Sequence, residues 1–484
     1  MTQGAISVQA RPAAAWRSLL IVGLGTSVVP LDSAVNIDFP AIVARFALPI
    51  PMIQWIVIAY VLTQTSLMLT FGRIGDILGY RRVFLFGTGF SALAFLACAL
   101  SPTYAMLVAA RVAQGIGAGL ILSCGPALAT SLYPEAMRAQ VLGRYMAMFG
   151  IGYALGPSAF GILVSQLGWS AVFSVRAPIA AAAFLLAWTL PKAPRAATTE
   201  PFDAAGGTLL AAALSFLLLT LNRLREPGPA LAVFAVAAVA CFVLFYRQER
   251  RFSRPIIDFD YFRDWGFIVT NIANALVNLA AFAIMLLAPF HLARIPDLSL
   301  PEAGFVLASS PFAMIFAAPL AGRLARRGAT GIAPRVIAIV GTALSSAGLF
   351  GIAWASGGAG GGSGAGLGTG PGLSPGSSPG SGLVWLVVAM LAQGFGVGLF
   401  QVAYFDIITA TIPARSRGVA GALGMATRSI GTVTGATVLM LIFQTLRASG
   451  GEGGFTPAFQ ATFAVAGAIA AGMAVIQVLV RGRG

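Results

Sequence analysis

The chain has 484 residues, of which 58% are hydrophobic and only 9% are charged. Soluble domains carry about 25% charged residues. So apolar a chain could not cover itself with a polar surface, which indicates that lipid is its solvent. Its 30 lysine and arginine residues outnumber its 15 acidic residues. That excess of positive charge would suit a nucleic-acid partner, but the positions of the basic residues along the chain indicate that it reflects the orientation of the protein in a membrane.

Fourteen apolar runs follow one another along the chain. Each is long enough to cross a hydrocarbon core about 30 Å thick at about 1.5 Å per residue. In chain order they lie at roughly 17–37, 52–71, 83–101, 104–125, 139–165, 169–190, 204–222, 229–246, 266–291, 300–321, 333–354, 383–405, 418–445 and 457–480. The runs predict an all-α polytopic membrane protein. Residues 1–15 are polar and small and are followed by Arg17 and an apolar run, which together resemble a signal peptide, but no convincing A-x-A cleavage site follows, so we expect an uncleaved first span.

The basic residues predict the orientation of these spans. If both ends lie on one side, the loops of that side hold 21 of the 30 basic residues and the opposite loops hold five. The remaining four lie inside apolar runs. This positive-inside bias predicts that both termini are cytoplasmic. The basic excess is then a topology signal and a contact with anionic lipid, and no nucleic-acid partner is needed.

An internal repeat divides the chain. Residues 113–120 read AQGIGAGL and residues 392–399 read AQGFGVGL, at an offset of 279 residues. The same offset carries Arg138 onto Arg417, Gly152 onto Gly431 and Gly156 onto Gly435. Gly72 and Arg73 pair with Gly322 and Arg323 at an offset of 250, and the Gly/Ser-rich segment 356–382 accounts for the difference.

The repeat predicts three parts. They are an N-terminal six-helix half at 1–192, two extra helices with a basic cytoplasmic loop at 193–263, and a C-terminal six-helix half at 264–484. Segment 356–382 cannot form a packed element and is predicted to be a flexible outer loop of the C-terminal half.

Motifs in order along the chain carry a resemblance to a known family. They are LDSAVNIDFPAI at 31–42, QWIVIAY at 54–60, GRIGDILGYRR at 72–82, RVAQGIGAG at 111–119, SLPEAGF at 299–305 and APLAGRL at 318–324. This set resembles the major facilitator superfamily, and specifically its fourteen-helix drug:proton antiporter branch. Six residues depart from the pattern of that branch: Asp38, Ile77, Tyr80, Phe160, Arg176 and Arg326. The resemblance implies the major facilitator fold, with two six-helix halves and two extra central helices.

The loop at 72–82 is expected to act as a cytoplasmic gate, as the resemblance implies. Its matching residues are Gly72, Asp76, Gly79, Arg81 and Arg82. Glycines let helix ends approach closely, and Asp76 can meet either a helix N-terminus or an arginine, with Arg138 and Arg144 as candidates. The resemblance also implies an exchanger motif in the fifth helix, at Gly152, Gly156 and Pro157.

Asp32 lies inside the first apolar run. Burying a carboxylate at bilayer depth costs roughly 2.5–3.5 kcal/mol, and such residues usually mark ion paths. It is interpreted either as a proton carrier, with a proton and a cationic substrate competing for it, or as a static partner of an interior arginine. By resemblance, Arg111 acts in proton coupling; pairing with backbone carbonyls is the alternative.

Several polar and aromatic residues are candidates for a substrate cavity. Asn271, Asn274 and Asn278 share one helix face, which either lines the cavity or bonds neighbouring helices. Trp55, Tyr60 and Tyr404 can stack on a lipophilic ligand, although Trp55 also suits an interfacial belt. Arg428, like Arg176, has no assigned role; arginines in the cavity would favour an anionic or zwitterionic substrate.

The sequence also excludes some function classes. It has no GxxxxGK[ST] motif for a nucleotide, and its one histidine permits neither a catalytic triad nor a metal cluster, so we expect no enzyme, metal or cofactor. The leading hypothesis is proton-coupled antiport of lipophilic or cationic drugs by a monomer in a bacterial cytoplasmic membrane. The partners are then a small-molecule substrate, protons and the bilayer. The alternatives are a more selective proton-coupled solute exporter or importer, and a non-transporting receptor or scaffold.

Overall fold

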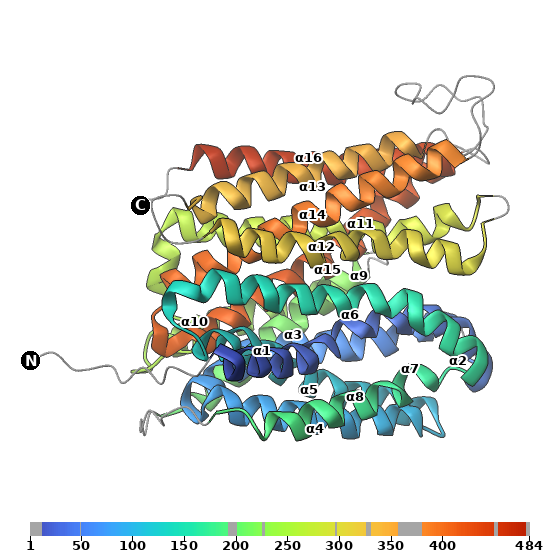
Figure 1. The fold of residues 1–484 in the computed structure, drawn as a ribbon. Helices are drawn as coiled ribbons and strands as arrows, with labels where there is room; N and C mark the ends of the chain where they lie inside the picture. The colour runs from blue at the N-terminus through green and yellow to red at the C-terminus, as the bar shows by residue number, and fades with distance from the viewer. Residues whose placement is uncertain are drawn as a thin grey trace, which may run out of the picture.

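The computed structural model describes residues 12–48, 50–191, 201–224, 228–295, 298–325, 331–356, 380–449 and 454–480. Every regular element in these ranges is a helix. Figure 1 shows the long helices running side by side, with α1 beginning and α16 ending at the same end of the bundle. Most of the predicted outer loop 356–382 lies outside the described residues.

The elements before residue 200 are α1 (Pro12–Ser27), η1 (Pro30–Asp38), α2 (Phe39–Phe46), η2 (Ile50–Ile53), α3 (Gln54–Leu78), α4 (Tyr80–Ala99), α5 (Tyr104–Ser131), η3 (Glu135–Met137), α6 (Arg138–Leu167), α7 (Ala171–Ser174) and α8 (Arg176–Ala187). The later elements are α9 (Ala204–Arg223), α10 (Pro229–Glu249), η4 (Phe259–Arg263), α11 (Trp265–Leu292), α12 (Leu300–Leu324), α13 (Pro334–Ala355), α14 (Gly380–Thr411), η5 (Ala414–Ser416), α15 (Arg417–Ser449) and α16 (Phe455–Leu479).

Within the described residues, twelve helical segments are long and apolar enough to cross a membrane. Two of the fourteen predicted runs, 139–165 and 169–190, are not among the twelve. The first is covered by α6, which has 30 residues. The second is divided at Val175 between α7 and α8, so neither part reaches the length of a full span.

The first span is helical from Trp16 to Val35, as the apolar run at 17–37 predicted, but its α-helix breaks off and continues as a 3-10 helix, which the run did not predict. Helix α1 ends at Ser27, and the chain continues from Pro30 as the 3-10 helix η1. Proline has no backbone N–H and its ring clashes with the preceding helical turn, so it ends or kinks a helix. The break places Asp32 in the first turn of η1.

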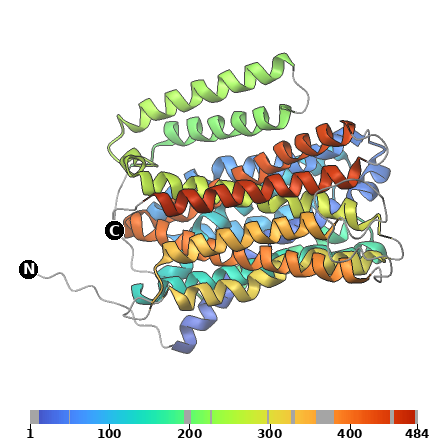
Figure 2. The same cartoon turned by 90° about the horizontal axis from the view of Figure 1, so that it is seen from above.

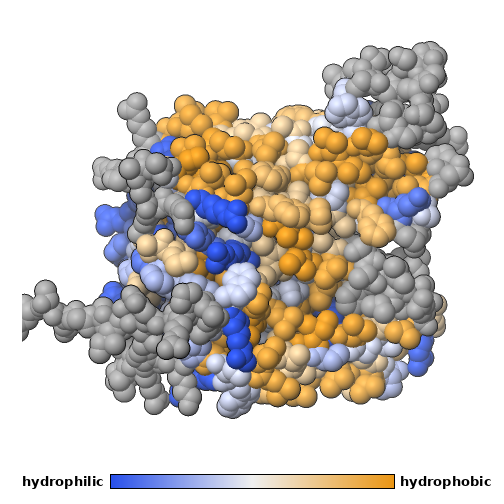
Figure 3. Space-filling model, viewed as in Figure 1, coloured by the Kyte–Doolittle hydropathy of each residue, from blue (hydrophilic) through white to orange (hydrophobic). Residues whose placement is uncertain are grey.

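The surface has the polarity of a membrane-spanning bundle. Apolar residues cover the middle of the face in Figure 3, and hydrophilic residues gather at the end where α1 begins and α16 ends. Helix α10 has a strongly exposed apolar face, on which Val233, Val236 and Val239 are all more than 60% exposed. Since such a row of exposed valines in water would be unfavourable, this face fits contact with lipid.

Helices of the two predicted halves occupy different parts of the bundle and meet along α6 and α12 and along α3 and α15 (Figure 1). A Cβ on Gly72 would lie 2.6 Å from the carbonyl oxygen of Gly418, and one on Gly322 would lie 2.6 Å from that of Ala139. The repeat offsets of 250 and 279 carry the first pair onto the second. The same close contact is therefore made twice, once by each half on the other.

Helices α9 and α10 pack on each other at one side of the bundle, as Figure 2 shows. Helix α9 also packs on α3 and α15. The hydroxyls of Ser66 and Ser215 lie 2.8 Å apart, and Thr70 donates to the carbonyl of Gly207 over 3.3 Å. The extra pair is thus attached through α9, while α10 contributes mainly an exposed apolar surface.

The close contact at Gly72 gives a first testable expectation. Gly72→Val would drive a side chain into backbone atoms of α15, and we expect it to destabilise the folded protein by about 1–3 kcal/mol, the usual cost of overpacking. Gly472→Val is the matched control, because nothing lies within 4 Å of a Cβ at that position on α16. Thermal unfolding of both variants in the same detergent measures the difference. Equal melting temperatures would contradict the expected clash.

Candidate functional site

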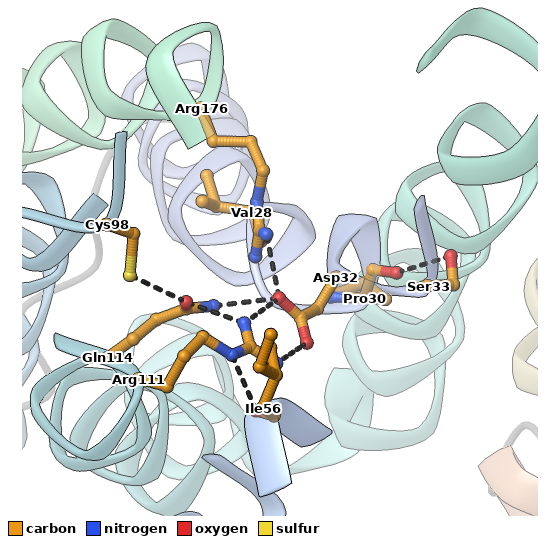
Figure 4. A network of polar contacts seen from close by, with 9 residues as sticks. All are labelled: Val28, Pro30, Asp32, Ser33, Ile56, Cys98, Arg111, Gln114 and Arg176. Atoms are coloured by element: carbon orange, nitrogen blue, oxygen red, sulfur yellow. Dashed lines mark hydrogen bonds and ion pairs between the residues drawn. The ribbon is translucent and has the colours of Figure 1, made fainter. Parts of the chain in front are cut away.

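Asp32 is the centre of a buried polar cluster, drawn in Figure 4. Arg111, on α5, donates to both carboxylate oxygens, from Nη1 over 2.6 Å and from Nη2 over 2.8 Å. Arg176, at the start of α8, donates from Nη1 over 2.8 Å. Gln114 donates from Nε2 over 2.8 Å. We call Asp32, Arg111, Gln114 and Arg176 the Asp32 cluster; it joins η1, α5 and α8.

Further contacts hold both guanidinium groups in place. Arg111 donates from Nε to the carbonyl of Ile56 over 2.9 Å and lies 4.4 Å from the ring centroid of Tyr60. Arg176 donates to the carbonyl of Val28 over 3.1 Å and lies 4.3 Å from the ring of Phe95. Neither arginine has any exposed surface. Each is therefore fixed by hydrogen bonds on one side and by an aromatic face on another.

The charges of the Asp32 cluster do not cancel. One carboxylate faces two guanidinium groups, which leaves a net charge of +1 in the interior. The carboxylate accepts four hydrogen bonds and donates none, which is the pattern of an ionised, acceptor-only group. Both oxygens are engaged, so a cationic ligand has no free oxygen to bind in this conformation. The predicted direct competition between a proton and a cation for Asp32 does not fit this geometry.

Arg176 and Gln114 are the members of the cluster to which the sequence gave no role. The structure pairs Arg176 with an acid 144 residues away. For Arg176 a signal was present: an arginine inside an apolar run needs a partner, and Asp32 is an acid inside another run of the same half. The sequence alone could not say which interior arginine would reach it, and both Arg111 and Arg176 do.

At the end of α3, Asp76 binds the N-terminus of α15. Its carboxylate accepts from the backbone N–H groups of Gly418 over 2.7 Å and Val419 over 3.2 Å. The hydroxyl of Tyr80, where the resemblance would place a basic residue, donates to it over 2.8 Å. Of the two predicted partners, the helix N-terminus is therefore found, and pairing with Arg138 or Arg144 is wrong. Helix N-termini favour carboxylates because their first N–H groups lack partners.

Arg138 binds other acids at the same end of the bundle. Its Nε donates over 2.8 Å to Asp406 of α14, and both side chains are buried. Arg138 and its repeat equivalent Arg417 both form ion pairs with Glu135. We call Asp76, Glu135, Arg138, Asp406 and Arg417 the gate cluster. It joins the two predicted halves by ion pairs and by hydrogen bonds to a helix end.

The other residues of the 72–82 motif shape its turn. Gly79 joins α3 to α4 with a φ of 91°, in the left-handed region that favours glycine. Arg81 donates to the carbonyl of Trp188 over 2.7 Å, and Arg82 is exposed. Arg144, a predicted partner of Asp76, lies instead over the ring of Trp16 at 5.3 Å. The motif thus positions Asp76, while Arg81 bonds the C-cap residue of α8.

The predicted exchanger motif of α6 packs against the broken first span. A Cβ on Gly152 would overlap the carbonyl oxygen of Ser27, and one on Gly156 would overlap the hydroxyl of Ser33. Only glycine lets α6 come so close to the segment that holds Asp32. The side chains of Pro157 and Asp38 lie outside the described residues.

The asparagine stripe of α11 bonds neighbouring helices. Asn274 donates to the carbonyl of Gly424 over 2.9 Å and to Thr427 over 2.7 Å, both on α15. The hydroxyl of Tyr404, on α14, donates to Asn271 over 3.0 Å. Asn278 accepts from Gln401 over 3.1 Å and donates to the side chain of Asn274 over 3.1 Å. These bonds support helix-to-helix bonding, and a role of the stripe in lining the substrate cavity stays a prediction.

Three predicted cavity residues have different surroundings. Trp55 is 39% exposed at the start of α3, which favours its alternative role in an interfacial belt. Tyr60 is buried beneath Arg111. Arg428, on α15, lies between the halves with its guanidinium 4.5 Å from the ring centroid of Phe149 and 5.4 Å from that of Tyr153, both on α6.

The sequence matches a known protein family over most of its length. The model of the Major Facilitator Superfamily matches residues 18–366. The chain therefore belongs to that family, and it is an integral membrane transporter of small molecules rather than an enzyme.

Individual relatives are similar over most of their length. The riboflavin transporter RibZ of Clostridioides difficile (strain 630) is 28% identical over 436 residues, which cover 88% of each chain. The multidrug resistance protein Stp of Mycobacterium tuberculosis (strain CDC 1551 / Oshkosh) is 28% identical over 428 residues, covering 87% of this chain and 74% of Stp. The crystal structure of the human organic anion transporter MFSD10 (TETRAN) has a similar fold, with a TM-score of 0.63. It is 15% identical, and the match covers 97% of this chain and 100% of that one.

Proposed function

We propose that this transporter is a proton-coupled antiporter that exports lipophilic drugs by alternating access, as a monomer in the cytoplasmic membrane of a bacterium. The observation that carries the proposal is Asp32, a carboxylate inside a membrane span whose ionised form holds three helical segments together. Similarity to the multidrug resistance protein Stp supports drug export. Cationic drugs, the other expected class, are less favoured because Arg111 and Arg176 already occupy the carboxylate.

The proposed topology has fourteen crossings, as in the drug:proton antiporter branch. It adds α6 and the α7–α8 pair to the twelve candidate spans. The two six-helix halves are 1–192 and 264–484, and 193–263 supplies the extra pair α9–α10. Both termini are cytoplasmic in this proposal, which the arginine bias and the common end of α1 and α16 support.

Coupling is proposed to pass through the helices. A proton on Asp32 removes the charge that holds Arg111 and Arg176, so η1, α5 and α8 are no longer joined by ion pairs. Helix α6 packs on η1 through Gly152 and Gly156, and it carries Arg138 of the gate cluster. Protonation can therefore alter the contacts between the halves. One charge moving through 100 mV is worth about 2.3 kcal/mol, which is enough to bias such a switch.

The gate cluster is proposed to close the cytoplasmic side. Its ion pairs and hydrogen bonds all lie between elements of the two halves or in the η3 turn beside them. Opening toward the cytoplasm would break them together. Access would then alternate as one half rocks on the other.

Transport by the full-length protein in proteoliposomes tests the proposal. Three fluorescent probes are compared: ethidium as a permanent cation, fluorescein sulfonate as a permanent anion, and riboflavin. With an acidic lumen, antiport is expected to accumulate at least one probe above the level of protein-free liposomes, and nigericin is expected to abolish that accumulation. Accumulation that survives nigericin, or that needs an alkaline lumen, would contradict antiport.

A more selective solute transporter is the second candidate. Similarity to RibZ over 88% of both chains favours it. Movement of riboflavin alone among the three probes would support this candidate, whereas movement of the dyes would support drug export.

A further inference from the structure

We infer that Arg428 binds an anionic group of the substrate, so that the substrates include lipophilic organic anions, with a carboxylate or sulfonate beside an apolar or aromatic body. This inference rests on the proposed transport function, and it narrows the class of molecule carried. Three observations support it: the position of Arg428, its missing counterion and its aromatic neighbours.

The position of Arg428 follows from the repeat. The offset of 279 residues makes Arg428 of α15 the equivalent of Phe149 of α6, and the guanidinium lies 4.5 Å from that ring centroid. Two positions that are equivalent in related halves, and that also touch, lie at the axis relating the halves. Each is eleven residues from the start of its helix, or about 16 Å along it, which is about half the thickness of the hydrocarbon core. Transporters of this kind bind substrate near this midplane point.

Arg428 has no counterion among the described residues. None of the ion pairs found there includes it, and its Nη1 atom is buried without a hydrogen-bond partner there. Asp32, the acid of the Asp32 cluster, is already held by Arg111 and Arg176. Arg428 is partly buried, and a charge inside a membrane protein normally has a partner, so an anion brought by a ligand would complete the site.

The aromatic neighbours indicate what else the ligand carries. Phe149 and Tyr153 lie beside the guanidinium, and their rings are 5.4 Å apart, centroid to centroid. An anionic head would reach Arg428, and an apolar or ring-bearing body would pack on these side chains. A permanent cation would meet the positive charge of Arg428 at the same point. The site therefore selects by charge as well as by hydrophobicity.

The alternative is a purely structural role, in which Arg428 only stabilises the folded protein through its two aromatic contacts. The two roles differ in what they predict for ligands of opposite charge. A stabilising residue would affect all substrates alike. An anion-binding residue would affect the anion selectively, and lysine would retain part of its effect.

The test compares Arg428→Gln and Arg428→Lys with Arg447→Gln, a control at the exposed end of α15. In proteoliposomes, Arg428→Gln is expected to raise the KM for fluorescein sulfonate at least tenfold, with little change in kcat, and to leave ethidium transport unchanged or faster. Arg428→Lys is expected to keep at least a third of the wild-type kcat/KM for the anion. Equal losses for both dyes, or an unchanged KM for the anion, would overturn the inference.

Equilibrium binding separates this inference from the proposed function. Fluorescence anisotropy of fluorescein sulfonate with purified full-length protein needs no gradient and no turnover. Binding to the wild type that weakens at least tenfold in Arg428→Gln would uphold the anion site even if gradient-driven transport failed. Absence of binding to the wild type, or equal binding to both proteins, would overturn it even if drug transport were observed.

Discussion

Replacing Asp32 by asparagine is expected to abolish gradient-driven accumulation and to lower the free energy of unfolding by about 3–5 kcal/mol. That is the usual cost of breaking a buried ion pair by removing one partner. Asparagine keeps the shape of the side chain but leaves Arg111 and Arg176 buried without a counterion. Accumulation under an imposed pH gradient and thermal unfolding in the same detergent measure the two effects.

A second substitution separates charge imbalance from proton coupling. Arg176→Gln is expected to be destabilising alone but to restore part of the stability of Asp32→Asn, because it removes one unpaired charge. Transport coupling should stay lost in the double variant, which has no carboxylate to carry a proton. Asp260→Asn, in an exposed turn, is the control. Gradient-driven accumulation by Asp32→Asn, or strictly additive stabilities, would refute the proposed role of the Asp32 cluster.

Asp406→Ala is expected to open the gate cluster. Truncating one partner of a buried, hydrogen-bonded charge pair costs about 2–5 kcal/mol, and the cost falls on the closed state in which Asp406 meets Arg138. The readout is maleimide labelling of Ala139→Cys, a buried position that touches Gly322, in a background without the three native cysteines. Labelling is expected to be at least tenfold faster in Asp406→Ala. The same rate as in an Asp260→Ala control would show that this ion pair does not hold the interface closed.

The helices were the most predictable feature of this protein. A lipid-spanning helix needs a long apolar run, and such runs are visible without knowledge of any neighbour. Breaks inside the runs were less visible. Pro30 stands in the sequence, but an apolar run long enough to span reads as continuous whether or not a proline interrupts it. The turn at Val175, which divides α7 from α8, is signalled only by Pro178, whose missing N–H leaves the carbonyl of Ser174 without its helical bond.

The pairings of the candidate site were less predictable, because each depends on how distant helices pack. Asp32 and Arg111 were singled out separately, as charges inside apolar runs, but nothing in their spacing shows that they meet or that Arg176 joins them. Asp76 had two possible partners, and the choice required the packing of α3 on α15. Tyr80 looked like a departure from the family pattern, and its hydroxyl proves to bind Asp76.

The twin contacts at Gly72 and Gly322 bear on how easily one half can turn on the other. At each contact, the backbone of the glycine lies against the backbone of the opposite helix, because glycine has no side chain to insert there. Because no side chains interdigitate at these two contacts, one helix can rotate against the other there without repacking of side chains. The polar bonds of the gate cluster are then one source of resistance to turning. Under the proposed alternating access, removing them is expected to raise the switching rate.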